Sequence, residues 1–192
     1  MMRDDGNAIS ASVRQRLREV QRVVEQIDEG PTENLLTAIE HAPAVFVTGK
    51  GRSGYIARCF AMRLMQMGLE THVPGEATCP RLVKDDLLIA VSCSGTTKTT
   101  VEISRLARDA GARVVVLTAT AESELSSLAH ELITVPITEQ TVTGGRGRPF
   151  GPHNNTLFEE TLLLYFDALI PGLMRRLDIP PSTLDRRHAN LE

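Results

Sequence analysis

Short β-rich runs, separated in several places by helix-length stretches, organise the middle of this chain. The runs lie at 44–48, about 70–73, 87–91, 113–118 and 132–135, and the helix-length stretches at 53–67, 97–110 and 123–130. Parallel strands need a crossover of a dozen or more residues, so this alternation predicts parallel pairing. The runs at 87–91 and 114–117 are apolar without alternation, which is typical of strands covered on both faces. The pattern therefore predicts an α/β fold, a three-layer α/β/α sandwich.

Helical patterns flank this core on both sides. Apolar residues spaced by three or four predict an amphipathic helix over 8–28, and Gly30-Pro31 is expected to end it before a second helix from Thr32 to His41. We therefore expect one domain over 1–192, made of N-terminal helices (1–43), the core (44–138), a flexible basic loop (139–155), a C-terminal helix (156–177) and a tail (178–192).

The first glycine-rich loop, Thr48-Gly49-Lys50-Gly51-Arg52-Ser53-Gly54, follows a predicted strand. Ligands of such sheets bind beyond the carboxyl ends of the strands, where this loop lies. Its glycines match the G-x-G-x-x-G pattern of dinucleotide sites, with Glu76 as a candidate ribose ligand. The same glycines would also let the chain pass close to a sugar phosphate. We favour the sugar phosphate, because the glycine pattern alone is common.

The second loop, Ser92-Cys93-Ser94-Gly95-Thr96-Thr97, follows the run at 87–91. Hydroxyls at 92, 94 and 97 can converge on one phosphate, while Gly95 permits a left-handed turn. Taken alone, the loop is more typical of a serine-rich turn that caps a helix. Beside the first loop on the same edge, and next to a helix N-terminus, it predicts a site for a phosphate monoester.

Composition limits the ligands and the surroundings of the protein. The net charge of −3 argues against general nucleic-acid binding or an anionic membrane surface. The three cysteines have no C-x-x-C spacing, so we expect neither a disulfide framework nor structural zinc. No cofactor is expected, and no His, Asp or Glu cluster has metal-ligand spacing. No apolar run approaches the roughly 20 residues of a membrane span. A cytoplasmic protein is the expectation.

Four segments resemble the sugar isomerase (SIS) domain family. They are the Gly-x-Gly-Arg-Ser-Gly loop at 49–54, the Ser-x-Ser-Gly-x-Thr loop at 92–97, Thr156-Leu157-Phe158-Glu159, and the C-terminal hexapeptide Arg-His-Ala-Asn-Leu-Glu at 187–192. The hexapeptide narrows the resemblance to the 6-phospho-3-hexuloisomerases of the ribulose monophosphate pathway. The resemblance implies a five-stranded parallel sheet, a homotetramer, and interconversion of 3-hexulose 6-phosphate with fructose 6-phosphate.

The resemblance also implies roles for particular residues. Glu159 would be the base that moves a proton between C2 and C3 through a cis-enediol, although a glutamate in a first helical turn ordinarily just stabilises the helix N-terminus. His188 would enter an active site, its own or a neighbouring subunit's, although a histidine in a basic tail is ordinarily solvated. His153 is a weaker alternative for the same duty, and Glu160 is expected in solvent. The expected substrate-binding residues are Gly51, Arg52, Ser53, Ser92, Ser94, Gly95 and Thr97.

Two departures from the family pattern leave the substrate open. Cys93 and Thr96 stand where the family usually has glycine and glutamate, and the segment 152–155 differs ahead of Leu157. The phosphate hydroxyls survive both changes, while the shape of the sugar pocket is placed in doubt. An isomerase of another phosphosugar therefore remains an alternative. So does a sensor that binds sugar phosphates without catalysis.

Overall fold

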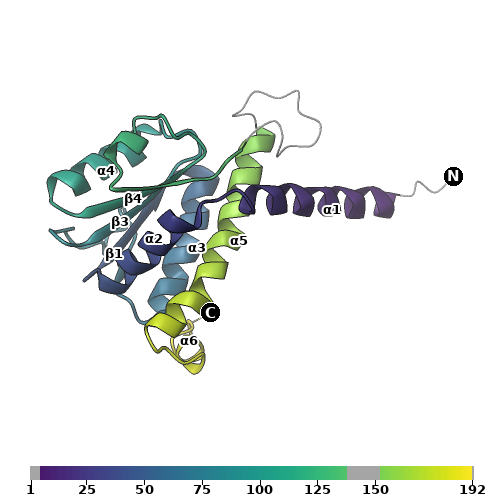
Figure 1. Ribbon diagram of the computed structural model, residues 1–192. Helices are drawn as coiled ribbons and strands as arrows, with labels where there is room; N and C mark the ends of the chain where they lie inside the picture. The colour runs from purple at the N-terminus through teal and green to yellow at the C-terminus, as the bar shows by residue number, and fades with distance from the viewer. Residues whose placement is uncertain (1–4, 138–151, 192) are drawn as a thin grey trace.

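The computed structural model describes residues 5–137 and 152–191, with side chains described for 9–137 and 156–191. Figure 1 shows helices on both faces of a central sheet, with the N-terminal helix extending away from the body. The elements are α1 (Asp5–Val24), α2 (Glu29–His41), β1 (Val45–Gly49), α3 (Gly51–Met67), β2 (Thr71–His72), β3 (Leu87–Val91), α4 (Lys98–Asp109), β4 (Arg113–Thr118), the 3-10 helix η1 (Ser126–Leu128), β5 (Glu131–Thr134), α5 (Pro152–Arg176) and α6 (Ser182–Arg186).

The central sheet has five strands in the order β2-β1-β3-β4-β5, and each neighbouring pair is parallel. The predicted parallel sheet and all five predicted strands are confirmed, with every strand boundary within one residue of the expected one. β1 and β3 are neighbours in register, with Val45 opposite Leu87 and Gly49 opposite Val91. Their carboxyl ends therefore lie side by side at one edge of the sheet.

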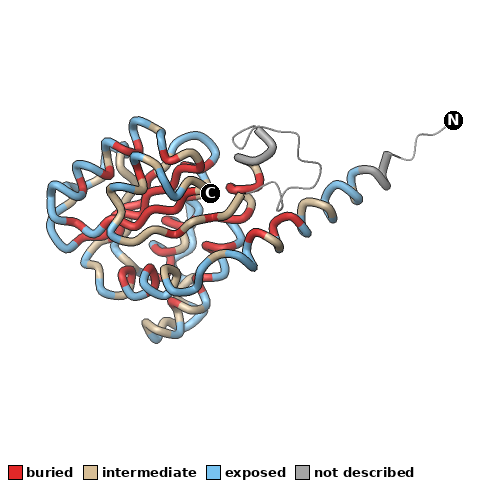
Figure 2. Tube along the Cα trace, turned by 45° about the horizontal axis from the view of Figure 1, so that its top comes forward, coloured by how far each residue is buried: buried red, intermediate tan, exposed pale blue. Residues whose placement is uncertain are grey.

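The core is divided between the two faces of the sheet, as the predicted sandwich requires. Alternate residues of β3, Leu87 and Ile89, pack with residues of α2, α3 and α5, whereas Leu88 and Ala90 pack with residues of α4. All four are at most 1% exposed. Side chains of a strand alternate between its faces, so a strand buried on both faces shows a continuous apolar run. Figure 2 shows this buried centre and the exposed outer helices.

The N-terminal helices are divided at a different place from the one expected. The first helix ends at Val24 instead of continuing to residue 28, and the second begins at Glu29 instead of Thr32. Asp28 caps the second helix, because its carboxylate accepts a 2.9 Å hydrogen bond from the Gly30 N–H. Gly30-Pro31 consequently lies inside the first turn, where proline is tolerated because its missing N–H is not needed there.

Two further expectations are corrected near the end of the chain. The stretch 123–130 forms only η1, because serine hydroxyls there bond locally to the backbone: Ser123 accepts from the Ser126 N–H at 3.2 Å and Ser126 donates to the Thr120 carbonyl at 2.8 Å. The last helix begins at Pro152, four residues before the expected start, since proline suits a first helical turn. The rest of the expected loop, 139–151, lies outside the described residues.

An aromatic stack joins α3 to α5. The rings of Phe60 and Phe166 lie 4.2 Å apart between centroids and are nearly parallel, with an interplanar angle of 10°. Each phenylalanine follows a polar residue by seven positions, Ser53 on α3 and Glu159 on α5. Seven residues are about two helical turns, so the stack lies on the same helix faces as these polar residues. It therefore holds α3 and α5 together beneath them.

His130 lies just before β5 and forms two hydrogen bonds with Val114 of β4. Its Nδ1 accepts the Val114 N–H at 3.0 Å, while its own backbone N–H donates to the Val114 carbonyl at 2.8 Å. A ring nitrogen that accepts a backbone N–H must be unprotonated. Burial lowers the pKa of His130, and the charges of Arg108 and Arg113 lower it further.

Stability is therefore expected to fall as the pH drops. Above the ordinary histidine pKa of about 6.5, His130 is neutral in both folded and unfolded chains. Below it, the unfolded chain takes up the proton more readily, so the free energy of unfolding decreases until the folded-state pKa is passed. The ring is only partly buried, so the effect should stay below about 1 kcal/mol. Urea denaturation at pH 8 and pH 5 measures it. His130→Asn keeps an acceptor without the titration and should lessen the difference; an unchanged difference would contradict this role.

No helix in the described part of the chain is long and apolar enough to cross a lipid bilayer.

Candidate active site

The two predicted loops meet at the carboxyl edge of the sheet because β1 and β3 are adjacent. Gly49 ends β1 directly opposite Val91, which ends β3. The chain then turns into α3 after β1 and into α4 after the 92–97 segment. Both helices begin at this edge, and the first N–H groups of a helix have no partner within it. The edge is therefore suited to an anion, even though the chain as a whole carries a net charge of −3.

Backbone packing explains the glycine pattern of the first loop. A Cβ on Gly54 would lie 2.7 Å from the Gly49 carbonyl oxygen, and one on Gly49 would lie 3.0 Å from the Val91 carbonyl oxygen. The first distance is shorter than real Cβ atoms show and the second is at the tight limit, so glycine at both positions lets α3 begin this close to the strands. Glu76, the candidate ribose ligand, instead forms an ion pair with Arg58 on α3. The G-x-G-x-x-G pattern therefore needs no nucleotide to account for it.

The 92–97 turn gathers hydroxyl groups in front of α4. Ser92 Oγ lies 3.1 Å from Thr97 Oγ1, and Ser94 Oγ lies 3.0 Å from Thr96 Oγ1. Gly95 has a φ of +64°, as predicted, and a Cβ there would lie 2.0 Å from Ser123 Oγ. Gly95 is thus required by both the left-handed turn and its packing.

Glu159 lies opposite this turn, on α5, with both carboxylate oxygens engaged. Oε2 accepts a hydrogen bond from Arg52 Nε, and Oε1 accepts one from Ser53 Oγ at 3.2 Å. Glu159 is only 5% exposed, and these bonds compensate for the burial of its charge. The hydrogen bond to Glu159, and then the charge of its carboxylate, raise the pKa of Arg52. The stack of Phe60 on Phe166, two helical turns further along, holds together α3 and α5, the two helices that carry these residues.

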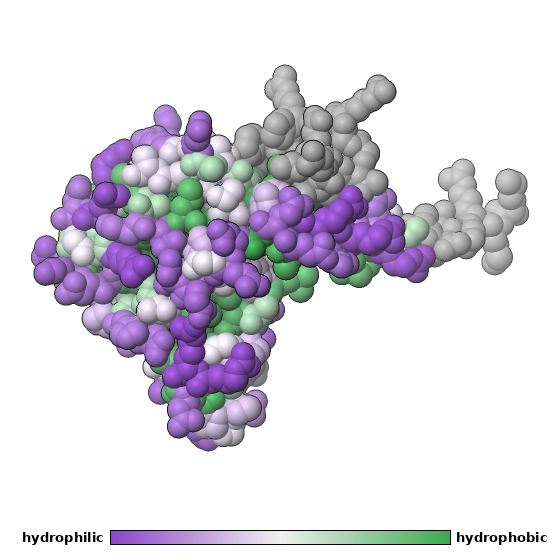
Figure 3. Space-filling model, in the orientation of Figure 1, coloured by the Kyte–Doolittle hydropathy of each residue, from purple (hydrophilic) through white to green (hydrophobic). Residues whose placement is uncertain are grey.

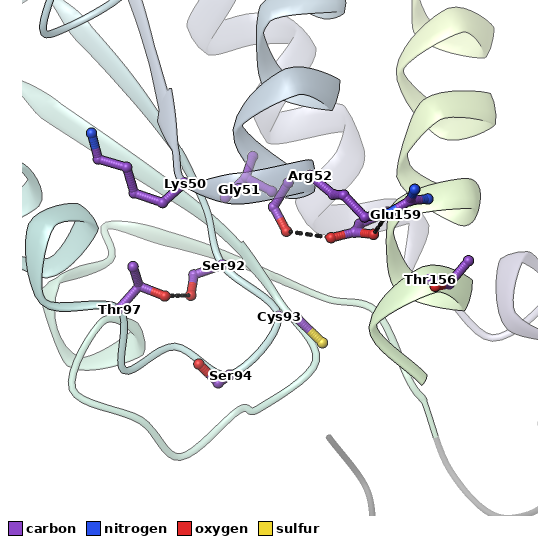
Figure 4. Close-up of a pocket in the computed structure, with 11 residues that line it drawn as sticks. Lys50, Gly51, Arg52, Ser92, Cys93, Ser94, Thr97, Thr156 and Glu159 are labelled. Carbon is purple, nitrogen blue, oxygen red and sulfur yellow. Dashed lines mark hydrogen bonds and ion pairs between the residues drawn. The ribbon is translucent and has the colours of Figure 1, made fainter. Parts of the chain in front are cut away.

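One cavity of about 510 Å³ connects the hydroxyl turn with Glu159 (Figure 4). It is lined by Lys50, Gly51, Arg52, Ser53, Val91, Ser92, Cys93, Ser94, Thr97, Thr156 and Glu159. Of the expected substrate-binding residues, all but Gly95 line it, and Gly95 shapes the turn. The lining also includes Lys50, Cys93 and Thr156, which were not among the expected site residues. Their places in the sequence could have indicated them, because Lys50 and Cys93 lie within the two loops and Thr156 precedes Glu159 by one helical turn.

His188 lies elsewhere in its own chain. It is exposed after α6, and the neighbouring Arg187 packs against Gly68 beyond the end of α3, where a Cβ on that glycine would lie 3.3 Å from Arg187 Cζ. Arg52 and Ser53 are at the opposite end of this 17-residue helix, which spans about 25 Å. The structure therefore does not bring His188 to the cavity of the same chain. The side chain of His153 lies outside the described residues.

Glu160 is not solvated as expected. It is half-buried and forms a 3.1 Å ion pair with Arg16 of α1. The two adjacent glutamates thus have different partners, because successive residues of a helix point about 100° apart. Glu159 points into the cavity, while Glu160 joins α5 to α1.

The geometry combines an anion site with a buried carboxylate. The hydroxyl turn, the helix N-termini and the cation Lys50 suit a phosphate ester, and Glu159 stands across the same cavity from them. A carboxylate in such a place can remove and return a proton on a carbon of the bound molecule. Among the described residues, no three His, Cys, Asp or Glu side chains are grouped closely enough to hold a metal ion.

Comparisons with known proteins agree with this geometry. The SIS domain family model matches residues 38–147. A Bacillus subtilis protein named 3-hexulose-6-phosphate isomerase is 35% identical over 92% of this chain and 95% of its own. A Mycobacterium gastri protein of the same name is 35% identical over 91% of this chain and 86% of its own. A Methanococcus jannaschii crystal structure, from which a 3-hexulose-6-phosphate isomerase function was inferred, has a TM-score of 0.78 at 30% identity, covering 95% of this chain and 99% of its own.

Proposed function

Because this chain belongs to the SIS domain family, we propose that its cavity isomerises a phosphosugar, interconverting 3-hexulose 6-phosphate and fructose 6-phosphate. The observation that carries the proposal is the single cavity that holds both the hydroxyl turn and the buried carboxylate of Glu159. The names of the relatives at 35% identity support this substrate pair.

The reaction moves a carbonyl group from C3 to C2. With the phosphate held by Ser92, Ser94 and Thr97, the Glu159 carboxylate takes the proton from C2, and the C–H electrons form the C2–C3 double bond. The electrons of the C3 carbonyl bond move onto O3, which takes a proton from water to give the cis-enediol. The electrons of the C2–C3 double bond then take the proton back from Glu159 to form the C3–H bond, while the O2–H proton passes to water and its electrons form the C2 carbonyl. One carboxylate suffices for both steps because both carbons present the same face to it.

Arg52 stabilises the charge that develops on oxygen during this transfer. Its Nε holds Glu159, and its planar guanidinium carries two further amino groups that can donate to an enediolate oxygen. Ser53 holds the other carboxylate oxygen at 3.2 Å. These two bonds fix the direction in which Glu159 approaches the sugar.

A panel of ketose and aldose phosphates tests the proposal directly. The purified protein should interconvert the 3-hexulose and fructose 6-phosphates without added metal or cofactor, and solvent deuterium should enter C2 or C3. Turnover of a pentose, heptose or amino sugar phosphate with none of the 3-hexulose or fructose 6-phosphates would overturn the 3-hexulose assignment. Tight binding of a phosphosugar with neither exchange nor turnover would show a sensor in place of an enzyme.

We further propose that the protein assembles into a homotetramer. On α1, Ile9, Val13 and Leu17 are spaced by four residues and are 53–70% exposed. Green residues lie along the lower edge of this projecting helix in Figure 3. On α3, Tyr55 and Met62 are seven positions apart and are 70% and 44% exposed. Apolar residues on two different helices match the two kinds of contact in a closed four-subunit assembly.

Charge placed on the α1 face should dissociate the assembly. Val13→Asp with Leu17→Asp is expected to halve the molar mass measured by light scattering, because burying the new carboxylates in an apolar contact is costly. Arg18→Asp, a charge change elsewhere on the same exposed helix, is the matched control and should leave the mass unchanged. A wild-type monomer would contradict the tetramer, and an unaltered mass in the double variant would exclude this face from the contacts.

A neighbouring copy is the proposed source of His188, since its own chain keeps it about the length of α3 away. Inactive Glu159→Gln and His188→Ala variants should then regain activity when their subunits are mixed. Some mixed sites would combine an intact Glu159 with an intact His188. No recovery after confirmed subunit exchange would contradict a shared site.

A further inference from the structure

Cys93 lies in the cavity between the hydroxyl turn, which is the proposed phosphate end of the site, and Glu159, which is the proposed reacting end. It follows Ser92 and precedes Ser94 in the hydroxyl turn, and it lines the same cavity as Glu159. Its side chain belongs to the part of the core formed with α3 and α5, and it is 7% exposed. Figure 4 shows its sulfur directed away from the hydroxyls of the turn, toward the α5 side where Thr156 lies.

The backbone of Cys93 is held firmly next to the end of β4. The Cys93 carbonyl accepts hydrogen bonds from Thr118 Oγ1 at 3.1 Å, from the Ala119 N–H at 3.1 Å and from Thr120 Oγ1 at 3.4 Å. Three donors from the end of β4 thus converge on one carbonyl oxygen. The backbone that carries the sulfur is consequently fixed relative to the sheet, and the side chain itself is buried.

We propose that the Cys93 side chain sets the length of sugar phosphate that the cavity accepts, by occupying the space beside the carbons between the phosphate and the reacting bond. This inference rests on the proposed function, because it takes the turn as the phosphate end and Glu159 as the reacting end. A ligand that spans the two must pass the sulfur. A longer carbon chain would have to bend into the volume that Cys93 fills.

In this role the thiol is uncharged and acts only by filling space. Burial, followed by the charge of Glu159, raises the pKa of Cys93 to about 12. The group therefore stays protonated at neutral pH and adds no second anion beside the carboxylate and the phosphate. Iodoacetamide, which reacts with thiolates, should label the exposed Cys59 well before Cys93.

Binding of sugar phosphates of different lengths tests the inference. Calorimetry would give Kd for ribulose 5-phosphate, fructose 6-phosphate and sedoheptulose 7-phosphate with wild type, Cys93→Ala, Cys93→Ser and Cys93→Val. One methylene's worth of space in a pocket is worth about 10–200-fold in discrimination. Cys93→Ala should therefore raise the affinity for the seven-carbon ligand, relative to the affinity for fructose 6-phosphate, by about tenfold or more. Cys93→Val should lower the affinity for fructose 6-phosphate and sedoheptulose 7-phosphate relative to the affinity for ribulose 5-phosphate.

Two controls separate size from other effects. Cys93→Ser keeps nearly the same size and should keep the wild-type order of affinities, while Cys59→Ala removes an exposed thiol outside the cavity. Ratios that stay within twofold of wild type in either folded size variant, alanine or valine, would overturn the inference. The measurement needs no turnover, so a protein that binds these ligands without isomerising them contradicts the proposed function and leaves this inference in place.

Discussion

Replacing Glu159 with glutamine should lower kcat for the isomerisation by about 10²–10⁴-fold, the range typical for loss of a general base. Glutamine keeps the size of the side chain and an oxygen that can accept from Arg52 or Ser53, so the cavity should keep its shape. The amide cannot take a proton from carbon. Fructose 6-phosphate should consequently bind within a few-fold of wild type while turnover is lost. Stopped assays for kcat, together with calorimetric Kd, make this separation.

The neighbouring glutamate provides the matched control. Glu160 stands next in the sequence but pairs with Arg16 on α1, away from the cavity. Glu160→Gln should therefore leave kcat nearly unchanged. A Glu159→Gln protein with near-normal kcat would remove Glu159 as the base, and an equal loss in both variants would indicate damage to α5 in place of lost chemistry.

The second large effect is expected at the hydroxyl turn. Ser94→Ala combined with Thr97→Ala should weaken fructose 6-phosphate binding by about 10²–10⁴-fold, because each lost bond to a charged phosphate costs about 1.5–3 kcal/mol. The loss should appear in Kd and KM, with a smaller effect on kcat at saturation. Inorganic phosphate, used as a competing ligand, should lose affinity in the same direction.

Thr99 is the control for this pair. It is an exposed residue in the first turn of α4 and does not line the cavity. Thr99→Ala should keep the wild-type Kd for fructose 6-phosphate. Unchanged affinity in the double variant would exclude the turn from the phosphate site, and a similar loss in Thr99→Ala would attribute the effect to the helix.

The fold could be predicted from the chain because its central strands are buried on both faces. Leu87–Val91 reads as an unbroken apolar run for this reason, and Gly68 and Gly111 mark helix ends with positive φ angles of 98° and 83°. The edge that carries the site follows from the parallel arrangement, since loops after adjacent parallel strands must meet. The hydroxyl turn and the first loop were therefore predicted correctly as neighbours.

Features that depend on contacts between distant segments could not be predicted in the same way. Nothing local shows that Glu160 pairs with Arg16 or that Ser53 bonds Glu159 across 106 positions. The same holds for Cys93, whose carbonyl is held by donors from the end of β4. The helix boundaries at Asp28 and Pro152 were missed because proline is read as a breaker, although it is favourable in a first turn.

The pairing of Gly49 with Val91 bears on how specificity in such a site can diverge. Backbone hydrogen bonds between adjacent strands fix the spacing at about 4.8 Å, whatever side chains the loops carry. Mutation in the loops can thus exchange the groups that hold a ligand without altering the distance between the two loops. A related protein would acquire a new ligand preference through changes in the size of the loop side chains that face the cavity, while the strands themselves would stay unchanged.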